Sequence, residues 1–213
     1  MRPRSVAGMG ALVLAAGVAA GASVSATAFQ APPAAARVVI ETTKGSIEAE
    51  IDVERAPVTA ANFLRYVDAG MYDGGVFHRA VRPDTELRKD VSIQVIQGGR
   101  ARGRGRGDGP AGFGPIPLER TSVTGLKHLD GALSMARSSP DSATSDFFIC
   151  VGDQPELDFG GRRNADGQGF AAFGRVVAGM DVVRAIQAAA VRDGTESLDP
   201  PVTIVRVYRR NPA

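Results

Sequence analysis

The side chains that most often carry enzyme chemistry are scarce in this sequence. Its 213 residues include one cysteine and two histidines, too few for a cysteine-based zinc site, an internal disulfide or a histidine-rich metal site. Cys150 ends the apolar run 147–150, which is typical of a small core residue rather than of a nucleophile. We therefore expect neither a bound metal nor covalent catalysis by a thiol.

Three other segments suggest ligand binding but lack the context it requires. Residues 107–112 match GxGxxG, yet they run into Phe-Gly-Pro, where no helix can begin to hold a pyrophosphate. Residues 158–169 are rich in Gly, Asp and Asn, but their acids do not fall at EF-hand spacing. Four arginines alternate with small residues, at Arg100, Arg102, Arg104 and Arg106. We interpret these arginines as part of a solvated loop and expect no nucleic-acid partner.

The remaining residues of chemical interest lie in five short segments. These are residues 56–63 (APVTAANF), 77–79 (FHR), 97–99 (QGG), 133–136 (LSMA) and 145–149 (SDFFI). Each has an ordinary structural interpretation on its own, since Arg79 can pair with any carboxylate and Phe148 can be a core residue. In this order and at this spacing, the segments resemble the cyclophilin family of peptidyl-prolyl cis–trans isomerases. The resemblance extends over residues 37–208.

The resemblance implies an enzyme without a cofactor that acts on X-Pro bonds of polypeptides. Amide resonance gives the peptide bond a rotation barrier of about 18–20 kcal/mol, and X-Pro isomers exchange over tens to hundreds of seconds. No covalent bond breaks, so an enzyme accelerates the exchange by binding the twisted imide better than either planar form. A cationic donor aimed at the imide nitrogen, inside an apolar pocket, favours that twisted state.

The resemblance also assigns roles to single residues. Arg79 matches the family arginine and is the expected catalytic donor. Gln97 is expected to hydrogen-bond the substrate backbone or to orient Arg79, and Phe148 is expected to form the floor of the proline pocket. The other expected substrate-binding residues are His78, Ala136, Leu157 and Phe170.

The sequence departs from the family pattern around this pocket. Residues 83–92 are an insertion between the segments that contain Arg79 and Gln97. The substituted positions are Gln94 and Val95 (usually Phe and Met), Arg137 (Asn), Asp146 (Gln), Glu156 (Trp) and Phe170 (His). We expect a pocket that is shallower or rebuilt by the insertion, and an Asp146 that competes with substrate for Arg79. A second function class therefore stays open, a weakly catalytic or non-catalytic module that binds Pro-containing segments or a partner protein.

The elements that position these residues read as eight short strands and two helices. Residues 46–51 alternate between apolar and polar, as in a strand with one buried face, whereas residues 57–69 follow the helical period. The other strands are expected at 38–41, 76–81, 92–97, 131–136, 146–151, 170–177 and 202–208, and the second helix at 180–190. Crossover helices for a parallel sheet are missing. We expect a mainly β fold, a closed eight-stranded antiparallel β-barrel capped by two α-helices.

The N-terminus reads as a targeting segment. Arg2 and Arg4 precede an uncharged stretch rich in Ala, Val and Gly that ends in Ala-Thr-Ala at 26–28, the pattern that signal peptidase cleaves. We assign residues 1–28 to a signal peptide, 29–36 to an Ala/Pro-rich tether and 37–213 to the isomerase domain, exported to the periplasm or the exterior. The alternative is an uncleaved membrane anchor, since about 20 apolar residues can span a bilayer.

Cleavage would change the charge balance of the chain. Removing Arg2 and Arg4 from the 25 basic residues leaves 23, equal to the 23 acidic residues. A balanced chain offers no global electrostatic reason to bind nucleic acid. The expected partners are X-Pro-containing polypeptides, with no membrane contact after cleavage and a monomeric state.

Overall fold

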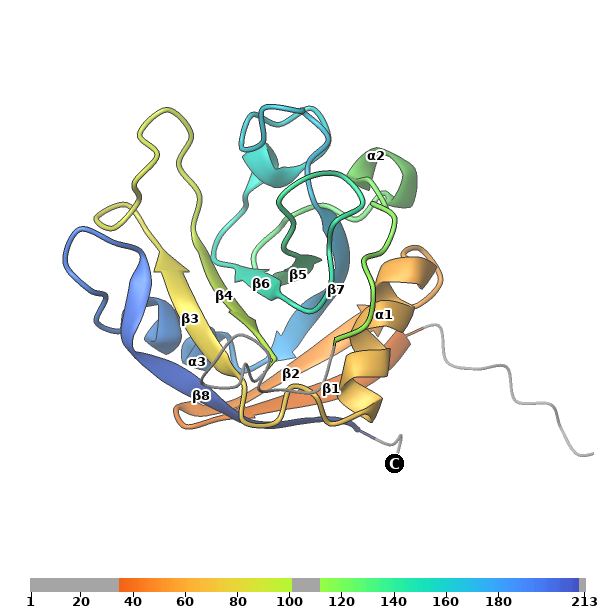
Figure 1. Ribbon diagram of the computed structural model, residues 1–213, viewed down its shortest axis with the longest axis horizontal. Helices are drawn as coiled ribbons and strands as arrows, with labels where there is room; N and C mark the ends of the chain where they lie inside the picture. Colours follow the sequence, from red (N-terminus) through yellow and green to blue (C-terminus); the bar gives the residue numbers. More distant parts are fainter. Residues whose placement is uncertain (1–34, 101–111, 211–213) are drawn as a thin grey trace, which may run out of the picture. The chain divides into compact units, whose positions relative to one another are not determined.

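Eight strands close into a barrel because each one alternates between an inner and an outer face. They are β1 (Ala35–Thr42), β2 (Gly45–Asp52), β3 (Val76–Val81), β4 (Val95–Gly99), β5 (Ala132–Met135), β6 (Phe147–Cys150), β7 (Ala171–Ala178) and β8 (Ser197–Arg209). Their order around the barrel is β1-β2-β7-β5-β6-β4-β3-β8, with every neighbouring pair antiparallel (Figure 1). The expected closed antiparallel barrel is confirmed.

The computed structural model describes residues 35–100 and 112–210, which fall within one compact unit, Pro33–Ala213. The assigned signal peptide, residues 29–34 of the tether and most of the Arg/Gly loop and the GxGxxG motif lie outside the described residues. Within the described ranges, no helix is long and apolar enough to cross a bilayer.

Alternation along β6 shows how the strands separate two apolar clusters. Phe147 and Ile149 belong to the large cluster inside the barrel, whereas Phe148 and Cys150 belong to a smaller cluster on the outer face. This is the side-chain period of two that a β-strand imposes. Cys150 is fully buried, and burial raises the pKa of its thiol, in keeping with a core residue and not a nucleophile.

The described residues form three α-helices rather than the expected two. They are α1 (Pro57–Asp68), α2 (Thr121–Thr124) and α3 (Met180–Gln187), and a 3₁₀ turn, η1, spans Pro155–Leu157. The missed helix, α2, is a single turn, too short to show a helical hydrophobic period. α1 packs against β2, β7 and β8, and α3 packs against β2, β3 and β4 (Figure 1).

The N-terminus of α1 is capped from a distant part of the chain. The residue before the helix is Ala56, which has no side-chain oxygen to offer the first backbone N–H groups. The Glu119 carboxylate instead accepts the N–H groups of Val58 at 3.1 Å and Thr59 at 2.7 Å. Glu119 therefore replaces a local cap and fastens α1 to the segment that leads into α2.

Candidate active site

A row of four side chains crosses the outer face of the barrel, one from each of four neighbouring strands. The strand register pairs Arg79 of β3 with Gln97 of β4, Gln97 with Phe148 of β6, and Phe148 with Ser134 of β5. Directly opposed residues of antiparallel strands have Cβ atoms about 4.5–5.5 Å apart. The row therefore places a cation, an amide, an aromatic ring and a hydroxyl side by side.

An irregularity in β3 at His78 decides which way Arg79 points. The ring of Phe77 lies in the barrel core, and strict alternation would send Arg79 into the core as well. The register of β3 instead shifts between Phe77 and Arg79, and the next core residue is Ala80. Bulges commonly re-aim side chains in this way next to active sites. Arg79 reaches the outer face with its side chain 30% exposed.

A cavity of about 290 Å³ lies beside this row and gathers most of the expected site residues. The expected residues that line it are Arg79, Gln97, Ala136, Phe148, Leu157 and Phe170. The additional lining residues are Ile93, Val95, Arg137, Arg163 and Asn164. His78 is not among the described residues that line it, since it occupies the irregular position between Phe77 and Arg79.

The floor of the cavity and part of its wall are apolar. Phe148 is 4% exposed and packs in the outer cluster with Val95 and the fully buried Leu157, which η1 carries. The ring of Phe170 stands edge-on to Phe148, with centroids 5.3 Å apart and an interplanar angle of 87°. Val95 and Phe170, two of the departures from the family pattern, thus both contribute apolar surface.

Ile93, which directly follows the inserted segment, adds another apolar residue to the cavity. It is 4% exposed and lines the cavity, although the neighbouring Gln94 replaces a family Phe. The inserted segment folds around Glu86, which is 2% exposed and accepts the backbone N–H groups of Arg88 at 3.2 Å and Ile93 at 3.1 Å. The insertion thus anchors the backbone of a cavity residue, while none of residues 83–92 is among the described residues that line the cavity.

Arg79 is held on two sides. Its Nη1–H donates to Oε1 of Gln97 at 2.9 Å. Its Nε–H donates to Oε2 of Glu196 at 2.8 Å, and its Nη2 lies 2.6 Å from the same oxygen. The structure thus pairs Arg79 with the carboxylate of Glu196. No sequence pattern indicates this partner, which lies 117 residues further along the chain.

Glu196 is ionised although it is mostly buried. Burial disfavours its charged form, but the hydrogen bond from the Leu87 backbone N–H and the interactions with Arg79 outweigh that effect and lower the pKa of the carboxyl. A carboxylate so placed accepts strong, directional hydrogen bonds from a guanidinium.

A buried histidine that the sequence interpretation missed supports the floor. His128 is 1% exposed, and its ring stacks on Phe148 with centroids 5.9 Å apart. Its Nδ1 lies 2.8 Å from Oδ1 of Asp158 and its Nε2 lies 2.9 Å from Oγ of Ser134. Burial lowers the pKa of His128 despite the opposing effect of Asp158. The Asp-His-Ser order resembles a hydrolytic triad, but Ser134 is fully buried, so its hydroxyl cannot reach a substrate.

Arg137 fixes the rim of the cavity beside Phe170. Its side chain is 1% exposed, its Nε–H donates to the carbonyl of Gly169 at 2.7 Å, and its two Nη groups bind Asp166 at 2.7 and 2.9 Å. The hydrogen bonds from Arg137 lower the pKa of Asp166 to about 2. The substitution of Asn by Arg at this position therefore serves to hold the 158–169 segment against the pocket.

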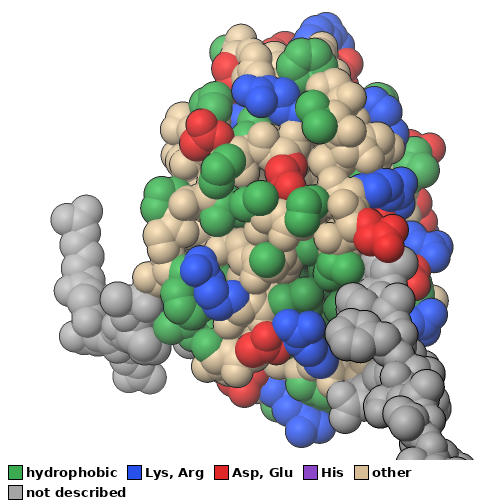
Figure 2. Space-filling view, turned by 90° about the vertical axis from the view of Figure 1, so that its right-hand side faces the viewer, with side chains coloured by type: hydrophobic (Ala, Val, Ile, Leu, Met, Phe, Trp, Pro, Cys, Tyr) green, Lys and Arg blue, Asp and Glu red, His purple; other side chains and the backbone are tan. Residues whose placement is uncertain are grey.

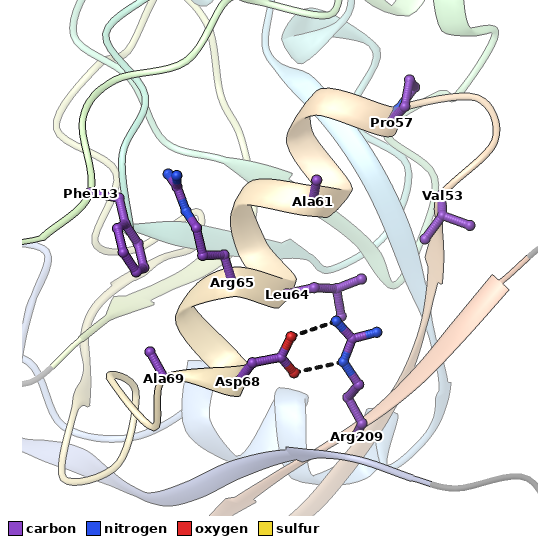
Figure 3. A pocket seen from close by; sticks show the side chains of 9 residues that line it. All are labelled: Val53, Pro57, Ala61, Leu64, Arg65, Asp68, Ala69, Phe113 and Arg209. Carbon is purple, nitrogen blue, oxygen red and sulfur yellow. Dashed lines mark hydrogen bonds and ion pairs between the residues drawn. The ribbon is translucent and has the colours of Figure 1, made fainter.

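Two larger cavities, each of about 650 Å³, lie elsewhere on the barrel. One lies along α1, where the guanidinium of Arg65 stands 3.9 Å from the ring centroid of Phe113 and Asp68 pairs with Arg209 (Figure 3). The other crosses the outer face of β2, β7 and β5. Among the described residues, neither lining includes any expected site residue. The residues that line the smaller cavity, and not its volume, therefore make it the candidate active site.

The described part of the chain offers no obvious alternative ligand site. It contains no group of three or more His, Cys, Asp or Glu side chains placed to hold a metal ion. On the face shown in Figure 2, basic and acidic side chains are interspersed, and hydrophobic side chains lie between them. That face does not form the single-sign patch typical of nucleic-acid binding.

Comparison with known proteins finds extensive similarity. A family model described as "Cyclophilin type peptidyl-prolyl cis-trans isomerase/CLD" matches residues 37–209. Peptidyl-prolyl cis-trans isomerase A of Dickeya dadantii is 39% identical over 162 residues, which cover 74% of this chain and 76% of the relative. A peptidyl-prolyl cis-trans isomerase of Streptomyces antibioticus is 34% identical over 174 residues, which cover 78% of this chain and 91% of the relative.

Solved structures show the same architecture. A crystal structure of a Cryptosporidium parvum cyclophilin-type peptidyl-prolyl cis-trans isomerase matches with a TM-score of 0.64 at 21% identity, covering 84% of this chain and 99% of that one. A second crystal structure of that protein, in the presence of the dipeptide Ala-Pro, matches with a TM-score of 0.63. At such identities the likeness shows the fold alone.

Proposed function

The chain belongs to the family of cyclophilin-type peptidyl-prolyl cis–trans isomerases, and on this premise we propose that it catalyses rotation about X-Pro bonds at the cavity beside Arg79. The observation that carries the proposal is a fixed guanidinium beside the apolar floor of the cavity. The reaction needs a cationic donor beside an apolar surface, because it makes and breaks no covalent bond and depends on stabilising one twisted conformation.

The apolar residues of the cavity would take the proline ring. Phe148, Leu157 and Phe170 present carbon surface, and their contact with the ring removes water from the neighbouring imide. A drier imide loses hydrogen bonds to its carbonyl, and those bonds favour the planar, resonance-stabilised form. The cavity thereby lowers the cost of twisting before any charged group acts.

Arg79 would then stabilise the twisted imide. A guanidinium has five N–H groups, and the contacts to Gln97 and Glu196 use three of them, on Nε, Nη1 and Nη2. One N–H on each terminal nitrogen remains for the substrate. When the C–N bond twists, the imide nitrogen becomes pyramidal and regains a lone pair, which a fixed cationic donor stabilises more than it stabilises the planar state.

An isomerisation assay tests this proposal directly. The purified chain should accelerate the cis–trans exchange of a short X-Pro peptide, and Arg79→Ala should remove most of the acceleration while the protein stays folded. If the folded wild-type chain binds X-Pro peptides without accelerating their exchange, the binding-module alternative is correct.

We further propose that the enzyme is exported and assists the folding of exported proteins. Support comes from the basic N-terminus, the uncharged stretch and the Ala-Thr-Ala pattern at 26–28. N-terminal sequencing of protein recovered outside the cytoplasm should begin at Phe29. A product that retains Met1 and sediments with membranes would instead support the uncleaved anchor.

A further inference from the structure

The Glu196 carboxylate bridges the guanidinium of Arg79 and the inserted segment. Its Oε2 accepts from Nε of Arg79 at 2.8 Å and lies 2.6 Å from Nη2. Its Oε1 accepts the backbone N–H of Leu87, within the inserted segment, at 3.0 Å. One side chain, only 10% exposed, thus contacts both Arg79 of β3 and Leu87 of the inserted segment.

The backbone of Glu196 is itself fixed to β3. Its carbonyl accepts the N–H of Ala80 at 2.9 Å, and the register pairs Ser197 with Arg79. The carboxylate therefore starts from a main chain that is anchored beside Arg79. Such an anchor restricts the positions that the carboxylate can occupy, and so those of the guanidinium it holds.

The inserted segment that contacts Oε1 is also well fastened. Glu86, at its centre, accepts from Nη1 of Arg163 at 3.0 Å, and the same Nη1 donates to the carbonyl of Val91 at 2.9 Å. The ion pair is buried, with side-chain exposures of 10% for Arg163 and 2% for Glu86. Arg163 and Ile93 both line the cavity and both donate to Glu86, so the segment that contacts Glu196 is hydrogen-bonded to the cavity wall.

We propose that Glu196 is a positioning residue for Arg79, which fixes the plane of the guanidinium against the cavity and couples it to the inserted segment. The inference rests on the proposed function, in which Arg79 acts at the X-Pro imide. An unrestrained arginine side chain populates many rotamers, and a misplacement of about 1 Å typically costs about 100-fold in rate. Gln97 restrains only Nη1, whereas Glu196 restrains both Nε and Nη2 and so determines the tilt of the group.

Charge and positioning predict opposite effects when Glu196 is removed. Loss of its negative charge strengthens the positive field of Arg79 at the substrate, which by itself favours catalysis. A fall in rate in Glu196→Ala can therefore not come from charge, and we expect a roughly 10- to 100-fold fall in kcat from lost positioning. Glu196→Gln, which keeps an oxygen acceptor of the same reach, should recover part of that fall.

The decisive experiment is a double-mutant cycle in the full chain. In the Arg79→Ala background, Glu196→Ala should change kcat by less than about twofold, because its effect passes through Arg79. A matched control is Glu119→Ala, which removes a carboxylate that accepts two backbone N–H groups on α1, away from the cavity. An unchanged kcat in Glu196→Ala, or an equal fall in both backgrounds, overturns the proposal.

A spectroscopic readout separates this inference from the proposed function. The Nε–H of Arg79 should give a sharp, slowly exchanging ¹H–¹⁵N signal in the wild type and in Glu119→Ala, and it should broaden or vanish in Glu196→Ala. If the wild type shows no isomerase activity, the proposed function fails, while this signal still decides whether Glu196 orders Arg79. A signal unaffected by Glu196→Ala overturns the positioning role itself.

Discussion

Arg79 and Gln97 face each other across β3 and β4, and Nη1–H of Arg79 donates to Oε1 of Gln97 over 2.9 Å. The hydrogen bond occupies the amide oxygen, so the NH₂ group of Gln97 remains available to a substrate carbonyl. Gln97 can thus serve both roles expected of it, orienting the cation and binding substrate backbone. The pair also shows that the site is built on strands, which hold their side chains more rigidly than loops do.

Arg79→Ala should lower kcat/KM by about 100- to 1,000-fold, the usual cost of removing one preorganised donor. Its melting temperature should fall only modestly, since the substitution leaves the mostly buried Glu196 carboxylate without its guanidinium partner, a loss that typically costs about 1–3 kcal/mol. An X-Pro peptide assay and a thermal melt measure the two quantities. Arg209→Ala breaks an ion pair with Asp68 on α1 and serves as the control, since it should leave kcat/KM unchanged. Comparable activity losses in the two variants would contradict a catalytic role for Arg79.

Arg137→Ala should raise KM more than it lowers kcat. The substitution removes the hydrogen bonds that hold Asp166 and the Gly169 carbonyl, and so releases the segment that carries Phe170. Gly169 is buried whereas Asp166 is exposed, and leaving one buried carbonyl unsatisfied typically costs about 1–3 kcal/mol of stability. Full kinetic curves on one X-Pro peptide, with a urea unfolding series, measure both effects. A fall in kcat at constant KM would show that Arg137 acts on the chemical step instead.

The free energy of unfolding should decrease as the pH falls below about 6.5 because of His128. Burial lowers the pKa of folded His128 below its ordinary value of 6.5, so the unfolded chain binds the proton first as the pH falls. The contribution of His128 is complete above pH 6.5 and is lost as the pH falls through the folded pKa. The pKa of its partner Asp158 is lowered from 3.8, so that group acts only at more acidic pH.

Urea unfolding at pH 7.5 and pH 5.5 measures this effect. His128→Gln removes the titrating ring, so the difference in unfolding free energy between the two pH values should shrink. A variant that keeps the full wild-type difference would assign the pH dependence to other groups.

Glu119→Ala should destabilise the fold without changing the enzyme. It removes the carboxylate that accepts the Val58 and Thr59 N–H groups at the start of α1. Losing a helix cap typically costs about 0.5–2 kcal/mol, which a urea titration resolves. Activity per folded molecule should match the wild type, and Glu54→Ala, in the exposed turn before the helix, should change neither quantity. A lowered kcat would mean that the start of α1 affects the geometry of the cavity.

The fold and much of the pocket follow from local sequence patterns. Strand alternation predicts the outward Phe148 and the inward Phe147, and a closed barrel follows once crossover helices are absent. The orientation of Arg79 does not follow from that pattern, because alternation from Phe77 points it inward and the irregularity at His78 reverses this. That irregularity leaves no mark in the sequence, since it arises from the pairing of β3 with β4 and β8.

The partners of the site residues were harder to predict than the residues themselves. Glu196 lies in a loop far along the chain, and no local period connects it to Arg79. His128 reads as an isolated histidine until the barrel brings it against Phe148 and Asp158. The cap from Glu119 has the same origin, a contact between distant segments that no short window contains. Helix α2 was missed for a different reason, since a single turn shows no helical period.

The position of β8 has a consequence for when the enzyme becomes active during its own synthesis. β8 is the last strand in the sequence, yet it lies between β1 and β3 and closes the barrel. Glu196 immediately precedes it. A nascent chain that ends before residue 196 has neither a closed barrel nor the carboxylate that holds Arg79. Isomerase activity should therefore be absent from every product that ends before residue 196 and arise only once the C-terminal segment has been released and docked.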